Sequence, residues 1–398
     1  MTVSILVAVT HLLGAGHLTR AAALGRACAR AGHRVTLVSG GRPAPLIDTA
    51  ALDFVQLPPV SAGASDLRAL LRPDGTAADA TYLSDRRDLM VDALGRVRPD
   101  VVVTELFPFG RRALSSEFEA LIEAAYALRP RPRIAASVRD ILVAPDRPAK
   151  VAHTHALLAR RYDAVLIHSD PGLAPLEASW PVDRSLAGRL IYTGYVDEEP
   201  ASAPTRDEPR SPGAEGAEAR WDVVVSGGSS EAGLLLYRAA VEAAALIPEC
   251  RWLVLVGAGV PEQEADAIRA ASRPNTTVTS ALRGFRDLLR RAAVFVGQAG
   301  YNTAIDILAS GVRSVLVPFE RGDETEQRIR AERLAAAGLA DVLPEAELSA
   351  PSLADAVRRA LAAPAPPPNR IDRRGATRSA TILADLAAGR ATTAGLAP

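Results

Sequence analysis

One stretch of the chain, GQAGYNTAIDILASGVRSVLVPFERGDETEQRIRAERL at residues 297–334, constrains the fold more than any other. It follows the β-branched and aromatic residues 294–296, which predict a buried strand that ends at Gly297. Two small residues, Ala299 and Gly300, then lead into an apolar helix, and a second strand ends at V-P-F. A strand, a tight turn, a helix and another strand in this order are typical of a parallel α/β sheet.

The start of that helix predicts an anion site. The first backbone N–H groups of a helix have no partner within it and carry the positive end of its dipole, which suits a diphosphate. Asp306 lies four residues after Asn302 on the same helical face, where its carboxylate can accept hydrogen bonds from ribose hydroxyls. Gln327 is expected to return from the next loop. We therefore predict nucleotide binding at this turn by Ala299, Gly300, Asn302, Asp306 and Gln327.

These residues resemble the donor-nucleotide half of the family 28 glycosyltransferases, typified by a bacterial wall enzyme that adds N-acetylglucosamine. The shared pattern is a small-residue turn, a Thr, an acidic residue, a V-P-F strand end and a Gln, which fall here on Ala299, Gly300, Thr303, Asp306, residues 317–319 and Gln327. The family usually has Glu where this chain has Asp306. The resemblance implies the α/β GT-B architecture, with two Rossmann-like, doubly wound parallel-sheet domains facing across a cleft. It also implies a UDP-linked sugar donor bound by the residues around this turn: Gln298, Ala299, Gly300, Tyr301, Asn302, Thr303, Asp306, Glu326 and Gln327.

Two domains of this kind are expected, because 398 residues are sufficient for two cores. Strands alternate with helices over residues 1–196, the expected acceptor domain, and again over residues 220–364, the expected nucleotide-sugar domain. Residues 197–219 are rich in Pro, Glu, Ser and Gly and have almost no large apolar side chains, which predicts a flexible linker. In the resembled fold a last helix, here at about residues 370–390, packs back on the first domain.

Charge and composition exclude several classes of function. The chain has 46 basic and 46 acidic side chains and few aromatic residues, so no nucleic-acid partner is expected. Cys28 and Cys250 are predicted to lie in different domains, which fits a reducing cytoplasm better than a disulfide framework. The apolar start lacks the basic segment of an export signal, and no apolar run reaches membrane-spanning length. We therefore expect a cytoplasmic protein.

The loop HLLGAGH at residues 11–17 nearly matches a dinucleotide fingerprint. Its third glycine would fall at Thr19, and the acidic residue expected about 20 positions later is missing, so NAD is disfavoured. In the resembled family a similar loop ending in His lines the acceptor side, and the match falls on Gly14, Gly16 and His17. A neutral imidazole at a helix start can take a proton, so His17 is the leading catalytic candidate. His11 is a weaker candidate for substrate contact.

Several polar side chains follow strands of the first domain, where the residues of a site gather. These are Glu105, Arg139, Asp140, His168 and Asp170. Glu105 and Asp170 are predicted to join His17 in catalysis, and the other three are predicted to contact the acceptor or the sugar. The alternative for Arg139 and Asp140 is a local ion pair.

In the second domain the segment SGGSSEAG at residues 226–233 predicts a glycine turn after a strand, and its amides and hydroxyls can hold phosphates. The resembled family has G-G-S there, which matches Gly227, Gly228 and Ser229, with Ser230 beside them. The base-reading loop of the family falls at residues 282–285, so Leu282 and Phe285 are expected to contact the nucleobase. Because that contact is made largely by backbone atoms, uracil, thymine and guanine stay open.

The resemblance implies an inverting, metal-independent glycosyltransferase in which His17 deprotonates the acceptor and helix amides hold the leaving diphosphate. His153 and His155 are two apart on a predicted helix and cannot chelate one metal there, and no cofactor is expected. Two rivals stay open: a UDP-sugar 2-epimerase of the same fold, with Glu105 and Asp140 as acid and base, and a non-catalytic nucleotide-sugar-binding protein. The acceptor, which is a small molecule or a lipid, a peripheral membrane contact and the oligomeric state also stay open.

Overall fold

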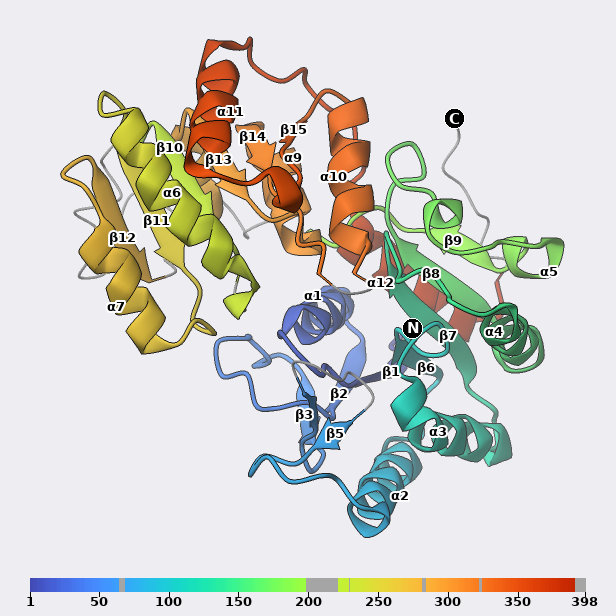
Figure 1. Ribbon diagram of the computed structural model, residues 1–398. Coiled ribbons are helices and arrows are strands. Elements are labelled where there is room, and N and C mark those ends of the chain that lie inside the picture. Colours follow the sequence, from blue (N-terminus) through green and yellow to red (C-terminus); the bar gives the residue numbers. More distant parts are fainter. Residues whose placement is uncertain (64–68, 198–220, 229, 281–283, 322–323, 391–398) are drawn as a thin grey trace, which may run out of the picture. The chain divides into compact units, whose positions relative to one another are not determined.

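A computed structural model describes residues 1–63, 69–197, 221–228, 230–280, 284–321 and 324–390 of the chain (Figure 1). The chain divides into two compact units. The first contains Met1–Glu198 and the segment that starts at Asp372, and the second contains Glu199–Ile371. The predicted linker at residues 197–219 lies outside the described residues except for Asp197. Each unit contains a parallel sheet with helices, so the predicted α/β class is confirmed.

The first unit is built on a seven-stranded parallel sheet with the order β3-β2-β1-β6-β7-β8-β9. The strand order reverses between β1 and β6, and ligands of such sheets bind beyond the carboxyl ends of the strands at this switch point. The strands are β1 Ser4–Val9, β2 Arg34–Ser39, β3 Asp53–Gln56, β6 Val101–Glu105, β7 Arg133–Arg139, β8 Ala164–His168 and β9 Leu190–Tyr192.

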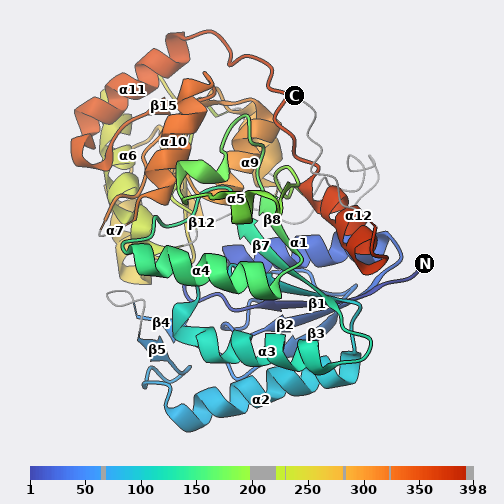
Figure 2. The ribbon, with the colours of Figure 1, turned by 90° about the vertical axis from the view of Figure 1, so that its right-hand side faces the viewer.

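Helices cover both faces of this sheet (Figure 2). On one face α1 (Gly16–Arg30) and α12 (Gly375–Ala387) enclose a core with residues of β1 and β2. On the other face α2 (Ala80–Val97), α3 (Ser115–Ala127) and α4 (Pro148–Arg161) enclose a second core. The shorter elements are β4 Ser61–Ala62, β5 Leu70–Leu71, η1 Arg112–Leu114, η2 Leu176–Ala178 and α5 Arg184–Ala187.

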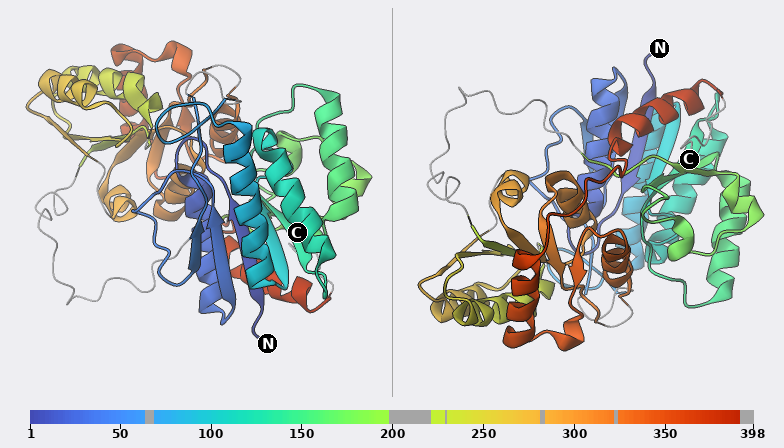
Figure 3. Two further views of the ribbon diagram at one scale, coloured as in Figure 1. Left: turned by 90° about the horizontal axis from the view of Figure 1, so that it is seen from below. Right: turned by 90° about the horizontal axis from the view of Figure 1, so that it is seen from above.

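The last helix, α12, lies beside α1 although more than 340 residues separate their sequence positions (Figure 3). Its start is fixed to the chain after β9, since Gly375 N donates to the Tyr195 carbonyl and Tyr195 N donates to the Asp372 carbonyl, both at 2.8 Å. A Cβ atom at Gly375 would come within 2.2 Å of the Gly194 carbonyl oxygen. Only glycine therefore allows the two backbones to approach this closely.

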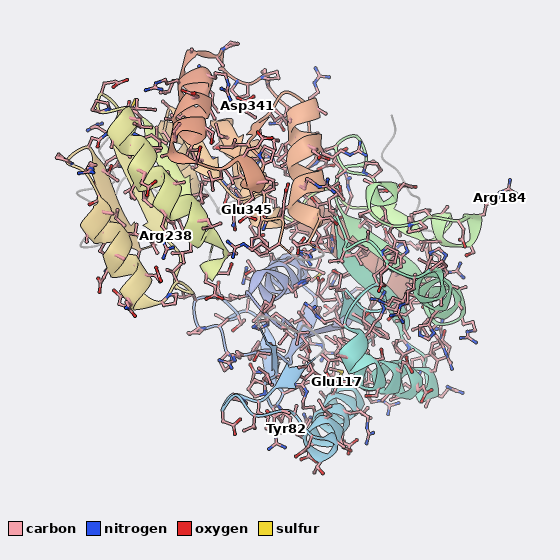
Figure 4. All side chains as sticks on the ribbon, viewed as in Figure 1. Tyr82, Glu117, Arg184, Arg238, Asp341 and Glu345 are labelled. Carbon is pink, nitrogen blue, oxygen red and sulfur yellow. The ribbon has the colours of Figure 1, made fainter. Side chains whose placement is uncertain are left out.

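A buried ion pair connects α2 and α3 to the loops at the end of the sheet. Glu117 of α3, labelled in Figure 4, accepts two hydrogen bonds of 3.0 Å from Arg86 of α2. Arg86 also donates to the carbonyl oxygens of Gly40, at 2.9 Å, and Pro58. These two carbonyls belong to the loops after β2 and β3, so one guanidinium holds both loops against the helices.

The second unit is built on a six-stranded parallel sheet with the order β12-β11-β10-β13-β14-β15. Its switch point lies between β10 and β13. The strands are β10 Val223–Ser226, β11 Trp252–Val256, β12 Thr276–Ser280, β13 Val294–Gly297, β14 Arg313–Leu316 and β15 Asp341–Val342. The helices are η4 Glu231–Gly233, α6 Leu234–Leu246, α7 Glu262–Ala271, α8 Phe285–Arg291, α9 Tyr301–Ser310, α10 Glu326–Ala336, η5 Glu345–Glu347 and α11 Ala350–Ala362.

Within the part of the chain that the structure describes, no helix combines the length and the apolar character needed to cross a bilayer. Cys28 lies in the first unit and Cys250 in the second, and both thiols are free and buried. Burial raises the pKa of the Cys28 thiol to about 12, which makes this side chain an unreactive part of the core.

Candidate functional site

The parallel sheet of the first unit brings several predicted site residues to one edge. His17 lies in the first turn of α1, soon after β1, and Glu105 is the last residue of β6. Glu105 pairs with Ser137 of β7, and His168 at the end of β8 pairs with Arg139. His17 and Glu105 therefore flank the switch point, where a ligand is expected in a sheet of this kind.

His17, Glu105 and Arg20 form a hydrogen-bonded group. His17 Nδ1 lies 3.1 Å from Glu105 Oε1, and Arg20 Nη2 donates to the same oxygen. The side chains of Glu105, Arg20 and His17 are 1%, 3% and 15% exposed. Burial raises the pKa of the Glu105 carboxyl, but the charge of Arg20 and the hydrogen bonds of His17 and Ser137 hold this pKa well below its usual range. Glu105 is therefore ionised at neutral pH.

Two charged neighbours face Nδ1 of His17. Glu105 Oε1, which only accepts, lies 3.1 Å away, and Arg20 Nη2, which only donates, lies 3.2 Å away and already donates to the same Glu105 oxygen. When the hydrogen of Nδ1 is directed to the carboxylate, Nε2 carries the lone pair. Burial and the nearby charge of Arg111 lower the pKa of His17 well below 6.5, although the hydrogen bond to Glu105 opposes them. The imidazole is consequently neutral at neutral pH and has a basic nitrogen directed away from Glu105. A general base requires this combination.

The glycine loop before His17 is exposed, whereas its first residue is not. Gly14 and Gly16 are exposed, and a Cβ atom at Gly16 would meet no atom within 4 Å. His11 is 3% exposed and packs against Gly41, and its Nδ1 has no hydrogen-bond partner among the described residues. Burial lowers its pKa. A substrate can therefore approach the loop glycines and His17 more readily than His11.

His168 is placed in the same network as Glu105, but behind it. The ring is fully buried, with Nε2 2.9 Å from Ser137 Oγ and Nδ1 2.9 Å from Thr193 Oγ1. Ser137 Oγ in turn lies 2.6 Å from Glu105 Oε2. Burial and the charge of Arg20 lower the pKa of His168 to about 3. A fully buried imidazole cannot touch an acceptor, so the predicted substrate contact of His168 is not supported.

Asp170 and Asp140 bond mainly to the protein itself. Asp170 accepts the Gly172 amide on Oδ1 and the Asp372 amide on Oδ2, both at 2.8 Å, and so fixes the segment that leads into α12. Asp140 is fully buried, and it accepts the Ile141 amide on Oδ1 and the Tyr195 hydroxyl on Oδ2, 3.2 Å away. These contacts favour structural roles for both carboxylates. Arg139, half-buried at the end of β7, lies close enough to His17 to lower its pKa.

In the second unit the glycine turn after β10 is shaped by Tyr237 of α6. Gly227 N donates to the Tyr237 hydroxyl at 2.9 Å, Gly257 N donates to it at 3.2 Å, and the hydroxyl lies 3.3 Å from the Gly228 carbonyl. A Cβ atom at Gly227 would come within 2.6 Å of Gly233 Cα. The Gly227 amide is thus engaged within the protein. Ser230 is exposed next to this turn, and Ser229 lies outside the described residues.

The start of α9 has the geometry expected of an anion site. Gly300 is the N-cap, with an extended backbone and no side chain that could cap the helix. The predicted glutamines hold the surrounding loops: Gln298 Nε2 donates to the Ala232 carbonyl at 2.9 Å, and Gln327 Oε1 accepts the Ala299 and Phe319 amides at 3.1 Å. Gln327 was expected in a loop, but it lies in the first turn of α10.

Asp306, predicted to bind the ribose, is half-buried one turn along α9. Arg286 Nε and Nη2 donate to its Oδ1 at 3.1 and 3.0 Å. Phe285, predicted to contact the base, packs edge-on against Phe295 with ring centroids 5.9 Å apart. Glu326 is 3% exposed, which leaves little of it for a ligand. Leu282 lies outside the described residues.

Comparison with known proteins shows which proteins the chain resembles. Residues 222–384 match the glycosyltransferase family 28 C-terminal domain. Over 360 residues, which cover 88% of this chain and 84% of the relative, the chain is 29% identical to the UDP-N-acetylglucosamine–N-acetylmuramyl-(pentapeptide) pyrophosphoryl-undecaprenol N-acetylglucosamine transferase of Rhodospirillum centenum. The chain is a GT-B glycosyltransferase that resembles family 28. The expected resemblance is thereby confirmed.

Solved structures show the same fold at low sequence identity. MurG of Acinetobacter baumannii aligns with a TM-score of 0.56 and 14% identity over 97% of this glycosyltransferase and 99% of that chain. The spinosyn rhamnosyltransferase SpnG, complexed with thymidine diphosphate, aligns with a TM-score of 0.57 and 17% identity over 98% of this chain and 96% of that one. At these identities the likeness establishes the GT-B fold alone.

Several residues that shape the site of this glycosyltransferase were not predicted from its sequence. In the first unit they are Arg20, Ser137 and Thr193, and in the second they are Tyr237 and Arg286. Arg20 was detectable, because it lies three residues after His17 and so on the same face of α1. Ser137 and Thr193 contact site residues that are distant in the sequence, and the strand order brings them together. Tyr237 and Arg286 reach their partners through the packing of α6 and α8.

Proposed function

We propose that this glycosyltransferase moves a sugar from a UDP-sugar to an acceptor hydroxyl or amine, with inversion and without a metal ion. The observation that carries the proposal is the His17–Glu105 pair, in which Nδ1 lies 3.1 Å from an ionised carboxylate. With the hydrogen on Nδ1, Nε2 is the basic nitrogen. The proposed donor follows from the name of the Rhodospirillum centenum relative, which uses UDP-N-acetylglucosamine.

In the proposed reaction Nε2 of His17 takes the proton from the acceptor. The acceptor oxygen or nitrogen then forms a bond to C1 of the sugar while the bond between C1 and the diphosphate oxygen breaks. Attack opposite to the leaving group inverts the anomeric carbon. Proton transfer by a positioned base contributes about 10²–10⁴-fold to such a rate. Glu105 stabilises the imidazolium that forms, because it remains ionised throughout.

The leaving diphosphate is proposed to bind at the start of α9. Backbone N–H groups of the first turn and the helix dipole supply positive charge there, and Gly300 presents no side chain that would block an approaching phosphate. Fixed dipoles of this kind stabilise charge that develops in a transition state without the need for a cation. No group of three His, Cys, Asp or Glu residues suited to a metal occurs in the described ranges.

The acceptor is proposed to be a small molecule or a lipid-linked sugar. The name of the Rhodospirillum centenum relative describes a lipid-linked acceptor, and SpnG carries a rhamnosyltransferase name from spinosyn synthesis. A lipid-linked acceptor would require a peripheral contact with a membrane surface. Leu13, in the loop before His17, is 61% exposed and can pack against the apolar part of a small molecule or of a lipid-linked sugar.

The donor can be tested without knowledge of the acceptor. Thermal denaturation with UDP, dTDP and GDP sugars should show stabilisation by the UDP-sugar alone, since a ligand at 100 times its Kd adds about 2.7 kcal/mol. Asp306→Ala should abolish that shift. Equal stabilisation by all three nucleotides, or none by any, would contradict the assigned donor.

The transfer itself is tested by incubation with UDP-N-acetylglucosamine and a panel of acceptors, with and without EDTA. We expect UDP release that depends on an acceptor, is insensitive to EDTA and is lost in His17→Ala. The anomeric configuration of the product, read by NMR, should be inverted. Conversion of the donor to its 2-epimer without an acceptor would instead identify an epimerase, and a retained configuration would exclude the proposed displacement.

A further inference from the structure

The residues behind Glu105 form a continuous chain of hydrogen bonds that the reaction itself does not use. Thr193 Oγ1, His168, Ser137 Oγ and Glu105 Oε2 follow one another at 2.9, 2.9 and 2.6 Å. All four side chains are buried, with at most 1% exposure. They come from three neighbouring strands and the residue after β9, so the chain runs across the carboxyl end of the sheet.

The direction of each hydrogen bond follows from the charge of Glu105. The ionised carboxylate can only accept, so the Ser137 hydroxyl must donate its single hydrogen to Oε2. The same oxygen of Ser137 then has only lone pairs left for His168. Nε2 of His168 is therefore the nitrogen that carries the hydrogen. Because burial keeps this ring neutral, its Nδ1 is then an acceptor, 2.9 Å from Thr193 Oγ1. The single hydrogen of that hydroxyl is shared with the Gly194 carbonyl at 2.8 Å and the Ile167 carbonyl at 3.2 Å, so the direction within the chain is set by Ser137 and not by Thr193.

On its other oxygen Glu105 accepts hydrogen bonds from His17 Nδ1 and Arg20. Both oxygens of the carboxylate are thus occupied, and each bond restricts rotation of the Glu105 side chain. A carboxylate that rotated about its last torsion would lose the bond to His17. The imidazole would then be able to place its hydrogen on Nε2, where it could not take a proton from an acceptor.

We propose that Ser137 and His168 are positioning residues, which hold Glu105 in the orientation that keeps the basic nitrogen of His17 available. The inference rests on the proposed function, in which His17 is the base. Neither residue touches a substrate. Their effect on the rate is transmitted through Glu105, in the way that outer partners orient the ligands of a catalytic group.

The chain of bonds can be tested by NMR of the free enzyme. Ring nitrogen-labelled histidine gives signals from only six residues, and their shifts distinguish the two neutral tautomers. In the native enzyme we expect the Nδ1–H form for His17 and the Nε2–H form for His168. In Ser137→Ala, His168 loses its acceptor and should shift toward the Nδ1–H form that donates to Thr193, and the signals of His17 should also change.

Kinetics give the second readout. Ser137→Ala should lower kcat about tenfold, a part of the 10²–10⁴-fold that a base contributes, and leave the donor KM unchanged. His168→Gln retains an N–H group that can reach Ser137 and should preserve most of kcat. Ser169→Ala is the matched control. Ser169 follows His168 in the chain and is as buried as Ser137, but its hydroxyl donates to the Ala174 carbonyl at 2.6 Å and not to Glu105.

The two proposals fail in different ways. If Ser137→Ala leaves the His17 signals unchanged and lowers kcat no more than Ser169→Ala does, the positioning role is wrong. If His168 shows the Nδ1–H form in the native enzyme, the assigned direction of the bonds is wrong. If His17→Ala retains full transferase activity, the proposed base is wrong, whatever the NMR signals of the other histidines show.

Discussion

Acid should destabilise the first unit through His168, and the size of the effect follows from its burial. The pKa of the folded imidazole is about 3, against 6.5 for an ordinary histidine. As pH falls below 6.5, the unfolded chain binds a proton that the folded chain does not. The contribution of the neutral His168 ring to the free energy of unfolding is therefore fully present above about pH 6.5. It is lost progressively as the pH falls toward 3. At about pH 5 the difference is 1.5 pH units, or about 2 kcal/mol.

The test compares native protein with His168→Gln, whose amide does not titrate. Urea unfolding at about pH 7.5 and about pH 5 should show that the native protein loses about 2 kcal/mol more than the variant between these conditions. His11 and His17 also have lowered pKa values, but they are present in both proteins, so their contribution cancels. For each protein, the free energy of unfolding at the lower pH is subtracted from the one at the higher pH. This difference does not contain any destabilisation by the substitution that is the same at both pH values.

The fluorescence of Trp180 reports on the unit that contains His168. Trp180 is 1% exposed in the first unit, whereas Trp221 and Trp252 lie in the second. Both proteins are therefore compared in a background with Trp221→Phe and Trp252→Phe. His153→Gln, at an exposed position on α4, is the control and should leave the pH dependence unchanged. Equal pH dependence in native protein and His168→Gln would refute the reasoning, since it would mean that the buried ring takes up protons like an ordinary one.

Three further predictions concern the two sites. Glu105→Gln leaves the guanidinium of Arg20 buried without its carboxylate, so urea unfolding should show a loss of about 3–5 kcal/mol. The kcat should fall at least as far as in Ser137→Ala. An unchanged free energy of unfolding would contradict the buried Arg20–Glu105 pair. Tyr237→Phe removes the shared acceptor of the Gly227 and Gly257 amides, so urea unfolding should show a loss of about 1–3 kcal/mol. Unchanged stability would contradict the described contacts of the hydroxyl. Gly227→Ala should lower the urea concentration at which the second unit unfolds, because the added Cβ would overlap Gly233. Gly300→Ala should not, because the added Cβ would meet only Thr303 Oγ1 at 3.6 Å. The reverse order would show that the backbone at these turns differs from the one described.

The sequence was sufficient to predict the fold and the edges of the sheets at which side chains gather. Apolar strands that alternate with helices leave few arrangements other than parallel sheets, and polar residues at strand ends, such as Glu105, were located correctly. The individual role of each of those residues was not predictable. Asp170 and His168 have the chemistry of catalytic groups, but the fold directs Asp170 to backbone amides and buries His168 behind Glu105.

The reason is that sequence reasoning treats each polar residue by itself, whereas its role depends on its neighbours across the sheet. Ser137 is an ordinary strand residue in the sequence, and only the register of β6 with β7 places its hydroxyl against Glu105. In the same way Asp306 was expected to face a ribose, and the contact with Arg286 arises from the packing of α8 against α9.

The return of α12 to the first unit has a consequence for biosynthesis. A ribosome makes the 173 residues from Glu199 to Ile371 after the seven-stranded sheet is complete but before α12 exists. At 5–20 residues per second this takes roughly 10–35 s. During that time the apolar face that Ala380, Leu383 and Leu386 will cover is open to water and to chaperones. The half of the enzyme that is translated first is therefore the half that finishes folding last.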